Sequence, residues 1–156
     1  MTDLVRWAAL APFLALAGAV INGLFGRSLR GNAAGVVASL AVAAGFVLSA
    51  LAFLGVREVG AVRVDLGDFL VAGDFTLGLG FHLDQLSVLM MLIITGVGLL
   101  IHVYSIGYMQ GDDGFSRYFA KLNLFVAAML VLVMADSYPL MFVGWEGVGV
   151  CSFLLI

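Results

Sequence analysis

Long apolar stretches separated by clusters of charged residues dominate the amino-acid sequence. Three stretches without Asp, Glu, Lys or Arg lie between Arg6 and Arg27, between Arg30 and Arg57, and between Asp84 and Asp112. Each is at least as long as the roughly 20 residues that a helix needs to cross a bilayer. They predict membrane-spanning helices at about residues 4–25, 33–56 and 85–109.

Two further helices follow in the last third of the chain. The apolar run between Lys121 and Asp136 is short, but Arg117 and Lys121 can extend their charged ends to the membrane surface. We therefore expect a fourth helix at about residues 116–135 and a fifth at about residues 138–156. The fifth is still apolar at Ile156, where no charge, Gly or Pro ends it. We expect the sequence to be a truncated piece of a longer protein.

Between the second and third predicted helices the pattern changes to a period of two. Apolar residues alternate with polar residues or Gly on both sides of a turn signal at Gly73–Asp74, at Val62, Val64 and Leu66 and then at Phe75, Leu77, Leu79 and Phe81. The alternation predicts a β-hairpin at about residues 61–81, with an irregular acidic loop as the alternative. A lone hairpin is marginally stable in water, so its apolar face should rest on helix ends or on a neighbouring subunit.

Composition excludes a soluble domain. The chain of 156 residues is 63% hydrophobic and 11% charged, whereas soluble domains are about 25% charged. The net charge of -3 offers no basic surface for nucleic acid, and one cysteine, Cys151, excludes a disulfide scaffold. The predicted fold class is an all-α integral membrane protein of about five helices with a short extramembrane β-hairpin.

Basic residues in the short loops predict the orientation. Arg27 and Arg30 lie in the first loop and Arg117 and Lys121 at the third, whereas the hairpin is acid-rich. Basic loops favour the cytoplasmic side. We expect these two loops in the cytoplasm, and the N-terminus and hairpin on the outer side of the membrane.

Glu146 is a charged residue that cannot lie at the membrane surface. It lies about eight residues, or about 12 Å, inside the fifth helix, in a hydrocarbon core about 30 Å thick. Buried acidic residues of this kind usually mark proton or ion paths, so Glu146 is the candidate proton carrier. The alternative is a protonated side chain that packs against a neighbouring helix. No basic residue of the chain lies at a matching depth, so a cationic partner would come from outside this sequence.

Four other polar residues are candidates for a functional or a structural role. His102, in the third helix, is either a proton relay or a packing residue. Lys121 either extends to the membrane surface or lines a channel. Asp84 and Asp136 precede helices, where both suit N-terminal caps.

The sequence contains no motif typical of other kinds of chemistry. We find no Gly-rich phosphate loop, no metal-ligand spacing and no nucleophile elbow. We therefore expect no metal site, no cofactor and no redox catalysis from this chain alone.

Four segments resemble a known family. They are FHLDQLS from Phe81, TGVGLLIHVYSIGYM from Thr95, RYFAKLNLF from Arg117 and GWEGVGVCSFLLI from Gly144. In this order they look like the N-terminal part of the largest antiporter-like subunit of respiratory complex I, called subunit L in bacteria and subunit 5 in mitochondria. The first two helices match only in hydropathy and spacing.

The resemblance implies a function. In that family the glutamate of the Gly-Trp-Glu-Gly motif, here Glu146, pairs with a lysine two helices later, and the pair is thought to gate proton movement coupled to quinone reduction. That lysine would lie beyond Ile156. NADH, FMN, iron–sulfur clusters and quinone would be bound by other subunits, and the partners would be other membrane subunits, especially a neighbouring antiporter-like one. The resemblance also implies a bacterial inner membrane, with the N-terminus and the hairpin on its periplasmic side.

Two other functions stay open at this point. One is the large subunit of a multisubunit sodium/proton antiporter, which has a similar core. The other is a structural membrane module that transports nothing.

Overall fold

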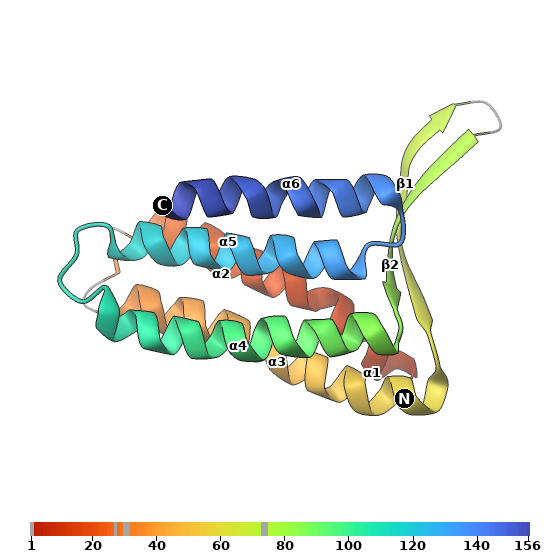
Figure 1. Ribbon diagram of the computed structural model, residues 1–156, viewed down its shortest axis with the longest axis horizontal. Coiled ribbons are helices and arrows are strands. Elements are labelled where there is room, and N and C mark those ends of the chain that lie inside the picture. Colours follow the sequence, from red (N-terminus) through yellow and green to blue (C-terminus); the bar gives the residue numbers. More distant parts are fainter. Residues whose placement is uncertain (1, 27, 30–31, 73–74) are drawn as a thin grey trace.

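The structure is a computed structural model that describes residues 2–26, 28–29, 32–72 and 75–156. Arg27 and Arg30 of the loop-charge prediction, and the predicted turn at Gly73–Asp74, lie outside the described residues. Five helical segments within the described residues are long and apolar enough to cross a membrane. A two-stranded hairpin separates the second from the third (Figure 1). The predicted fold class is confirmed, and the chain is an integral membrane protein.

The first spanning segment is interrupted. It consists of α1 (Thr2–Trp7), a 3₁₀ turn (Ala8–Leu10) and α2 (Ala11–Phe25). Pro12 explains the interruption, because it has no N–H to donate to the carbonyl group four residues earlier. The other segments are α3 (Ala33–Val59), α4 (Gln85–Tyr108), α5 (Phe115–Met134) and α6 (Tyr138–Leu155).

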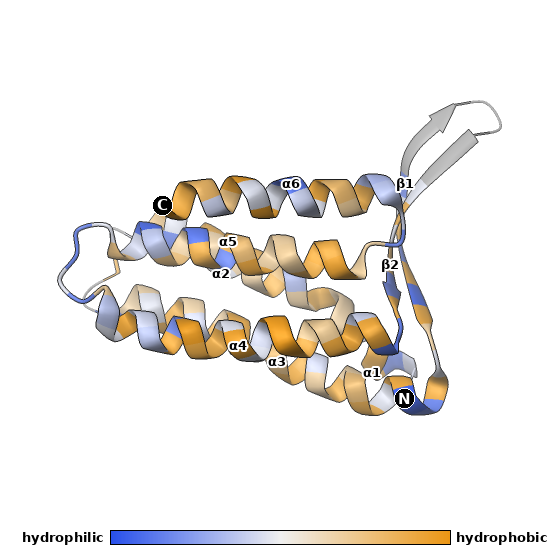
Figure 2. Ribbon diagram, viewed as in Figure 1, coloured by the Kyte–Doolittle hydropathy of each residue, from blue (hydrophilic) through white to orange (hydrophobic). Residues whose placement is uncertain are grey.

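The helices form a bundle with two distinct ends (Figure 1). One end, which we call the hairpin end, carries the hairpin and the α5–α6 connection. The other, the loop end, carries the α2–α3 and α4–α5 connections. Polar residues gather at both ends, whereas large apolar side chains such as Leu40, Leu100 and Phe153 are exposed along the bundle (Figure 2). This distribution fits a bundle whose sides face lipid.

α6 is the least covered helix. It packs against α5, where Gly144 and Gly147 allow close approach to Leu132 and Ala128. Only 11% of its span is buried, against 28–44% for the other spans. Most of the α6 surface is therefore available to lipid or to further protein.

The hairpin consists of β1 (Val62–Ala72) and β2 (Phe75–Leu83), paired antiparallel. Val62, Phe81 and Leu83 at its base are buried in the core of the bundle, so the hairpin rests on helix ends as expected. The register shifts at two irregularities in β1, and Gly67 at the first has a φ of +114°. Figure 1 shows the hairpin crossing the end of the bundle and projecting past α6.

The prediction that Asp136 caps α6 is wrong. Ser137 occupies the N-cap position, without a side-chain cap. The Asp136 carboxylate instead accepts a hydrogen bond of 2.6 Å from Arg63 on β1, and this contact raises the pKa of Arg63. The backbone N–H of Asp136 also donates to the carbonyl of Gly80 on β2. The α5–α6 connection is thus tied to the hairpin.

The predicted cap at Asp84 is confirmed. The Asp84 carboxylate accepts from the backbone N–H of Ser87 at 2.7 Å, and the Ser87 hydroxyl accepts from the Asp84 N–H at 2.8 Å. This capping box satisfies two backbone donors at the start of α4. The hydrogen bond from the Ser87 N–H lowers the pKa of Asp84.

We expect Asp84→Ala to lower the free energy of unfolding by about 0.5–2 kcal/mol, as loss of a helix cap usually does. Asp84→Asn keeps a capping oxygen and should cost less. The pKa of Asp84 is lower in the folded than in the unfolded state. The capping interaction therefore stabilises the folded state fully above the unfolded-state pKa, and this stabilisation is lost as the pH falls through the folded-state pKa. Equilibrium unfolding in detergent at pH 7 and at acidic pH measures both effects. Equal pH dependence in the wild type and in Asp84→Asn would contradict the assignment.

Candidate functional site

Glu146 lies midway along α6 on the side away from α5. Gly144 and Gly147 face α5, and the helical spacing of 100° per residue turns Glu146 away from both. The side chain is exposed in this chain. α5 therefore leaves Glu146 free for contacts with whatever covers the outer face of α6.

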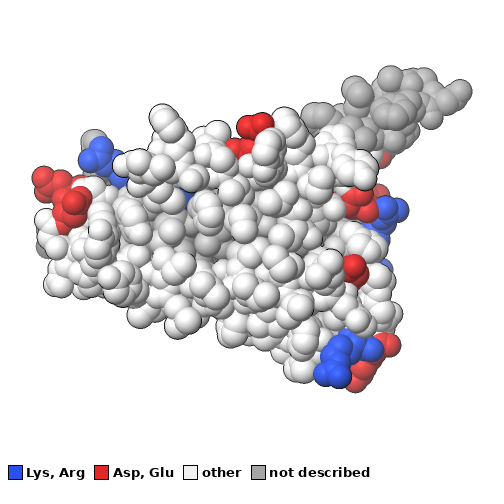
Figure 3. Space-filling view, viewed as in Figure 1, with Lys and Arg blue, Asp and Glu red and all other residues white. Residues whose placement is uncertain are grey.

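This position is unusual electrostatically. Figure 3 shows acidic atoms over the middle of α6 surrounded by uncharged surface, and Glu146 is the only acidic residue of that helix. The other charges in this view lie at the two ends of the bundle. Among the described residues, the ion pairs are Arg6–Asp3 and Arg63–Asp136, and neither involves Glu146. An acidic side chain at such a depth costs about 2.5–3.5 kcal/mol in lipid, which favours a protein or water-filled environment.

His102 lies in a different place, inside the bundle. Its ring is 0% exposed and contacts the ring of Phe119, with 6.1 Å between ring centroids. Nδ1 lies 2.7 Å from the carbonyl oxygen of Gly98, and Nε2 lies 2.6 Å from Oδ1 of Asn123 on α5. Both ring nitrogens of His102 therefore have partners.

Asn123 was not singled out from the sequence, although it is fully buried. Its Nδ2 atom has no hydrogen-bond partner among the described residues. A polar amide within an apolar span was the available signal, and it marks both Asn123 and Asn22 on α2. Asn22 uses its Nδ2 to donate to the carbonyl of Ala34 at 3.1 Å.

A second polar pair lies closer to the loop end. Ser105 is one turn from His102 on α4, and its hydroxyl is 3.2 Å from the hydroxyl of Tyr118 on α5. Ser105 is buried and Tyr118 is half-buried. The α4–α5 contact thus contains two polar pairs about one turn apart, and the second is nearer the loop end.

Lys121 joins neither group. Its Nζ atom donates to the carbonyl oxygen of Leu154, at 2.7 Å, near the loop end of α6. The contact directs the ammonium group toward the end of the bundle. Its role as a channel residue stays a prediction.

The structure does not bring His102 and Glu146 together. α5 lies between α4 and α6 (Figure 1), and α6 packs against α5. The two candidates therefore belong to separate regions, one inside the bundle and one on its outer face.

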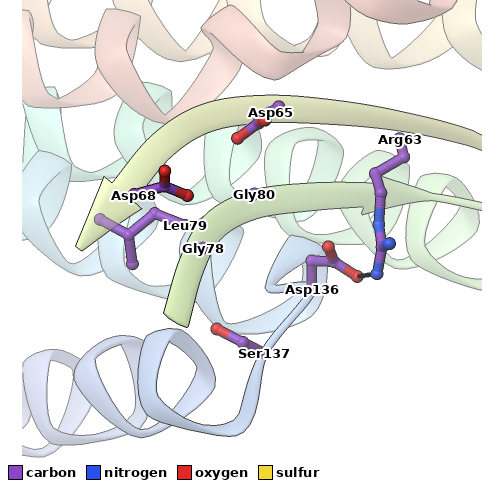
Figure 4. Close-up of a pocket in the computed structure, with 8 residues that line it drawn as sticks. All are labelled: Arg63, Asp65, Asp68, Gly78, Leu79, Gly80, Asp136 and Ser137. Atoms are coloured by element: carbon purple, nitrogen blue, oxygen red, sulfur yellow. Dashed lines mark hydrogen bonds and ion pairs between the residues drawn. The ribbon is translucent and has the colours of Figure 1, made fainter. Parts of the chain in front are cut away.

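A hollow of about 300 Å³ lies at the hairpin end. Figure 4 shows Arg63 and Asp136 pointing toward one another at its edge, with Asp65, Asp68 and Ser137 around it. One of its three carboxylates is already paired with Arg63. No group of three or more His, Cys, Asp or Glu residues suited to a metal ion occurs in the described part of the chain.

A family model and several relatives place the chain in one family. A family model described as "NADH-Ubiquinone oxidoreductase (complex I), chain 5 N-terminus" matches residues 69–119. NADH-quinone oxidoreductase subunit L of Neisseria meningitidis is 36% identical over 159 residues, which cover 100% of this chain and 23% of the relative.

Two further relatives carry the same name. Subunit L of Mycobacterium tuberculosis is 44% identical over 92% of this chain and 23% of its own length. Subunit L of Escherichia coli is 54% identical over 58% of this chain and 15% of its own length. The chain thus spans about a quarter or less of the length of these relatives.

Proposed function

Because this chain belongs to the family of NADH-quinone oxidoreductase subunit L, and matches its N-terminal part, we propose that it contributes to proton translocation in the membrane arm of complex I. The relatives are subunits of an enzyme complex. The proposed role is proton transfer coupled to quinone reduction, with no redox step on this chain. The observation that carries the proposal is Glu146, an acidic residue in the middle of an apolar spanning helix.

Glu146 would act as one half of a charge pair. Its side chain faces away from α5, and no described residue forms an ion pair with it. A helix that covers the outer face of α6 and carries a Lys at the same depth would complete the pair. Movement of that cation toward or away from the carboxylate would then change its affinity for a proton.

The redox cofactors would be held by other subunits. Iron–sulfur clusters require several cysteine ligands, whereas this chain has only Cys151, which is buried on α6. The sequence has no Gly-rich loop for the phosphates of NADH or FMN. The residues of this chain therefore do not fit these cofactors. Its proposed partners are neighbouring membrane subunits of the complex.

The experiment that tests this function compares NADH-driven proton translocation in vesicles that carry the wild-type chain with translocation in vesicles that carry Glu146→Gln. The complex must be assembled to the same level in both. Reduced translocation supports the proposal. Unchanged translocation overturns it.

The proposed orientation places the hairpin end in the periplasm of a bacterial cell and the loop end in the cytoplasm. We expect Asp68→Cys, on exposed β1, to react with a membrane-impermeant thiol reagent from the periplasmic side. Asp113→Cys, in the exposed α4–α5 connection, should react only from the cytoplasmic side. Cys151→Ser provides the background. Labelling of Asp68→Cys from the cytoplasm alone would reverse the orientation.

A further inference from the structure

We propose that His102 and Asn123 form a proton-binding pair, in which proton uptake by the imidazole ring and a half-turn of the Asn123 amide occur together. The proposal deepens the proposed proton translocation and rests on it. It adds a site inside the bundle that is separate from Glu146.

The hydrogen-bonding capacity of the two side chains defines two states. The carbonyl of Gly98 and Oδ1 of Asn123 can only accept, and they face the two ring nitrogens of His102 at 2.7 and 2.6 Å. Both nitrogens can bond to these two acceptors only when both donate, which requires the imidazolium form of the ring. A neutral ring that keeps its proton on Nδ1 needs a donor at Nε2. Asn123 supplies that donor when its amide turns by 180° and presents Nδ2.

Nothing else among the described residues holds the amide in one orientation. Nδ2 of Asn123 is buried without a partner, next to Gly18 of α2. A Cβ atom at Gly18 would lie 2.0 Å from Nδ2, so only Gly leaves room for the amide there. The two ends of an amide are nearly equal in size, and the turned group fits the same space. The protonation state of His102 therefore determines the orientation of Asn123.

Few titratable groups surround the pair. α2 contributes none, and those of α3, α4 and α5 besides His102 are Arg57, Glu58, Tyr104, Tyr108, Arg117, Tyr118 and Lys121. The two residues of α3 lie at its hairpin end, in its last turn. The two tyrosines of α4 and Arg117 are exposed, and Lys121 bonds to α6. The Tyr118 phenol is half-buried and bonds to the hydroxyl of Ser105, one turn from His102 on α4.

The loop end is the nearer end of the bundle for the pair, because His102 lies six residues from the last residue of α4. Tyr118 and Ser105 lie three residues, or about 4.5 Å along the axis, from the loop-end termini of α5 and α4. His102 lies one turn deeper on the same side of α4 as Ser105. A proton that enters at this end passes these two hydroxyl groups, which can both donate and accept, before it reaches the depth of His102.

The test is the pH profile of NADH-driven proton translocation by the complete complex in membrane vesicles. Loading of His102 becomes incomplete at alkaline pH, so the midpoint of the alkaline decline reports the proton affinity of the ring. Asn123→Asp places a charged acceptor at Nε2 and should raise the midpoint by about one to three pH units. Asn123→Leu removes the acceptor for the imidazolium and should lower it. His102→Gln should reduce the rate at every pH.

Asn22→Leu is the matched control. Asn22 is also a buried amide with one unpartnered atom among the described residues, but its hydrogen bond goes to the backbone of Ala34. Its substitution should leave the midpoint unchanged. Opposite shifts in Asn123→Asp and Asn123→Leu support the pair, because a purely structural role predicts no such opposition. Unshifted midpoints, or shifts in the same direction, overturn it.

A second measurement does not depend on activity. Histidine protonation is followed by pH-difference infrared spectroscopy of the complex with ring-labelled histidine, in the wild type and in Asn123→Asp. A histidine band that titrates at higher pH in Asn123→Asp supports the pair, and identical titrations overturn it. In the same vesicles, loss of translocation in Glu146→Gln with unshifted Asn123 variants overturns the pair alone. Full translocation in Glu146→Gln overturns the proposed function, and the infrared titration then decides the pair.

Discussion

Glu146→Gln is expected to lower NADH-driven proton translocation and the coupled quinone reduction at least about tenfold, toward the factor of about 10² that one positioned proton-transfer group typically contributes. The amide has nearly the same shape as the carboxyl group, but it can neither bind a transferable proton nor carry a charge. The measurement is acidification of inverted vesicles, normalised to the amount of assembled complex.

Two variants define the specificity of this result. Glu146→Asp keeps the carboxyl group and should retain part of both activities. Glu58→Gln makes the same chemical change at an exposed position in the last turn of α3, and should leave both unchanged. Normal translocation in Glu146→Gln would assign the carboxyl group to packing.

The spanning helices could be predicted because the bilayer imposes one simple rule. Every backbone polar group within the hydrocarbon must be bonded internally, so an uncharged apolar stretch of sufficient length becomes a helix. The first and last residues of the helices were harder to predict. α3 continues past residue 56 through Arg57 and Glu58 to Val59, because these side chains can reach the polar surface from the last turn.

Local patterns predicted local contacts and missed distant ones. The cap at Asp84 uses Ser87, three residues away, and was visible in the sequence. Asp136 looked like a cap by the same criterion, but its partner is Arg63, 73 residues away on β1. Only the folded hairpin brings these two residues together. The two irregularities in β1 likewise follow from pairing with β2, which alternation alone does not specify.

The candidate site likewise has features that the sequence predicts and features that only the structure shows. Charge and depth identified Glu146 without a structure. The side of α6 on which it lies was not predictable, because that helix is apolar on all sides and has no clear polar face. His102 was visible as a polar residue, but its partner Asn123 lies 21 residues away on another helix. Helix packing, and not helix formation, creates that pair.

The close contact between α5 and α6 leads to the second large effect. A Cβ atom at Gly144 would lie 2.6 Å from the backbone nitrogen of Leu132 and 2.7 Å from its Cα atom. Backbone atoms cannot move aside as the end of a flexible side chain can. A side chain at Gly144 must therefore push α6 away from α5, which is the helix that positions it.

We expect Gly144→Ala to destabilise the α5–α6 packing by about 1–3 kcal/mol, the usual cost of overpacking, and to reduce the assembled complex several-fold. Gly149→Ala is the matched control on the same helix, because a Cβ atom there meets nothing within 4 Å. The measurement is the amount of assembled complex in the membrane and its thermal stability in detergent. Equal assembly and stability of both variants would show that α6 can shift without cost. Glu146 would then owe its position to the protein that covers α6, and not to α5.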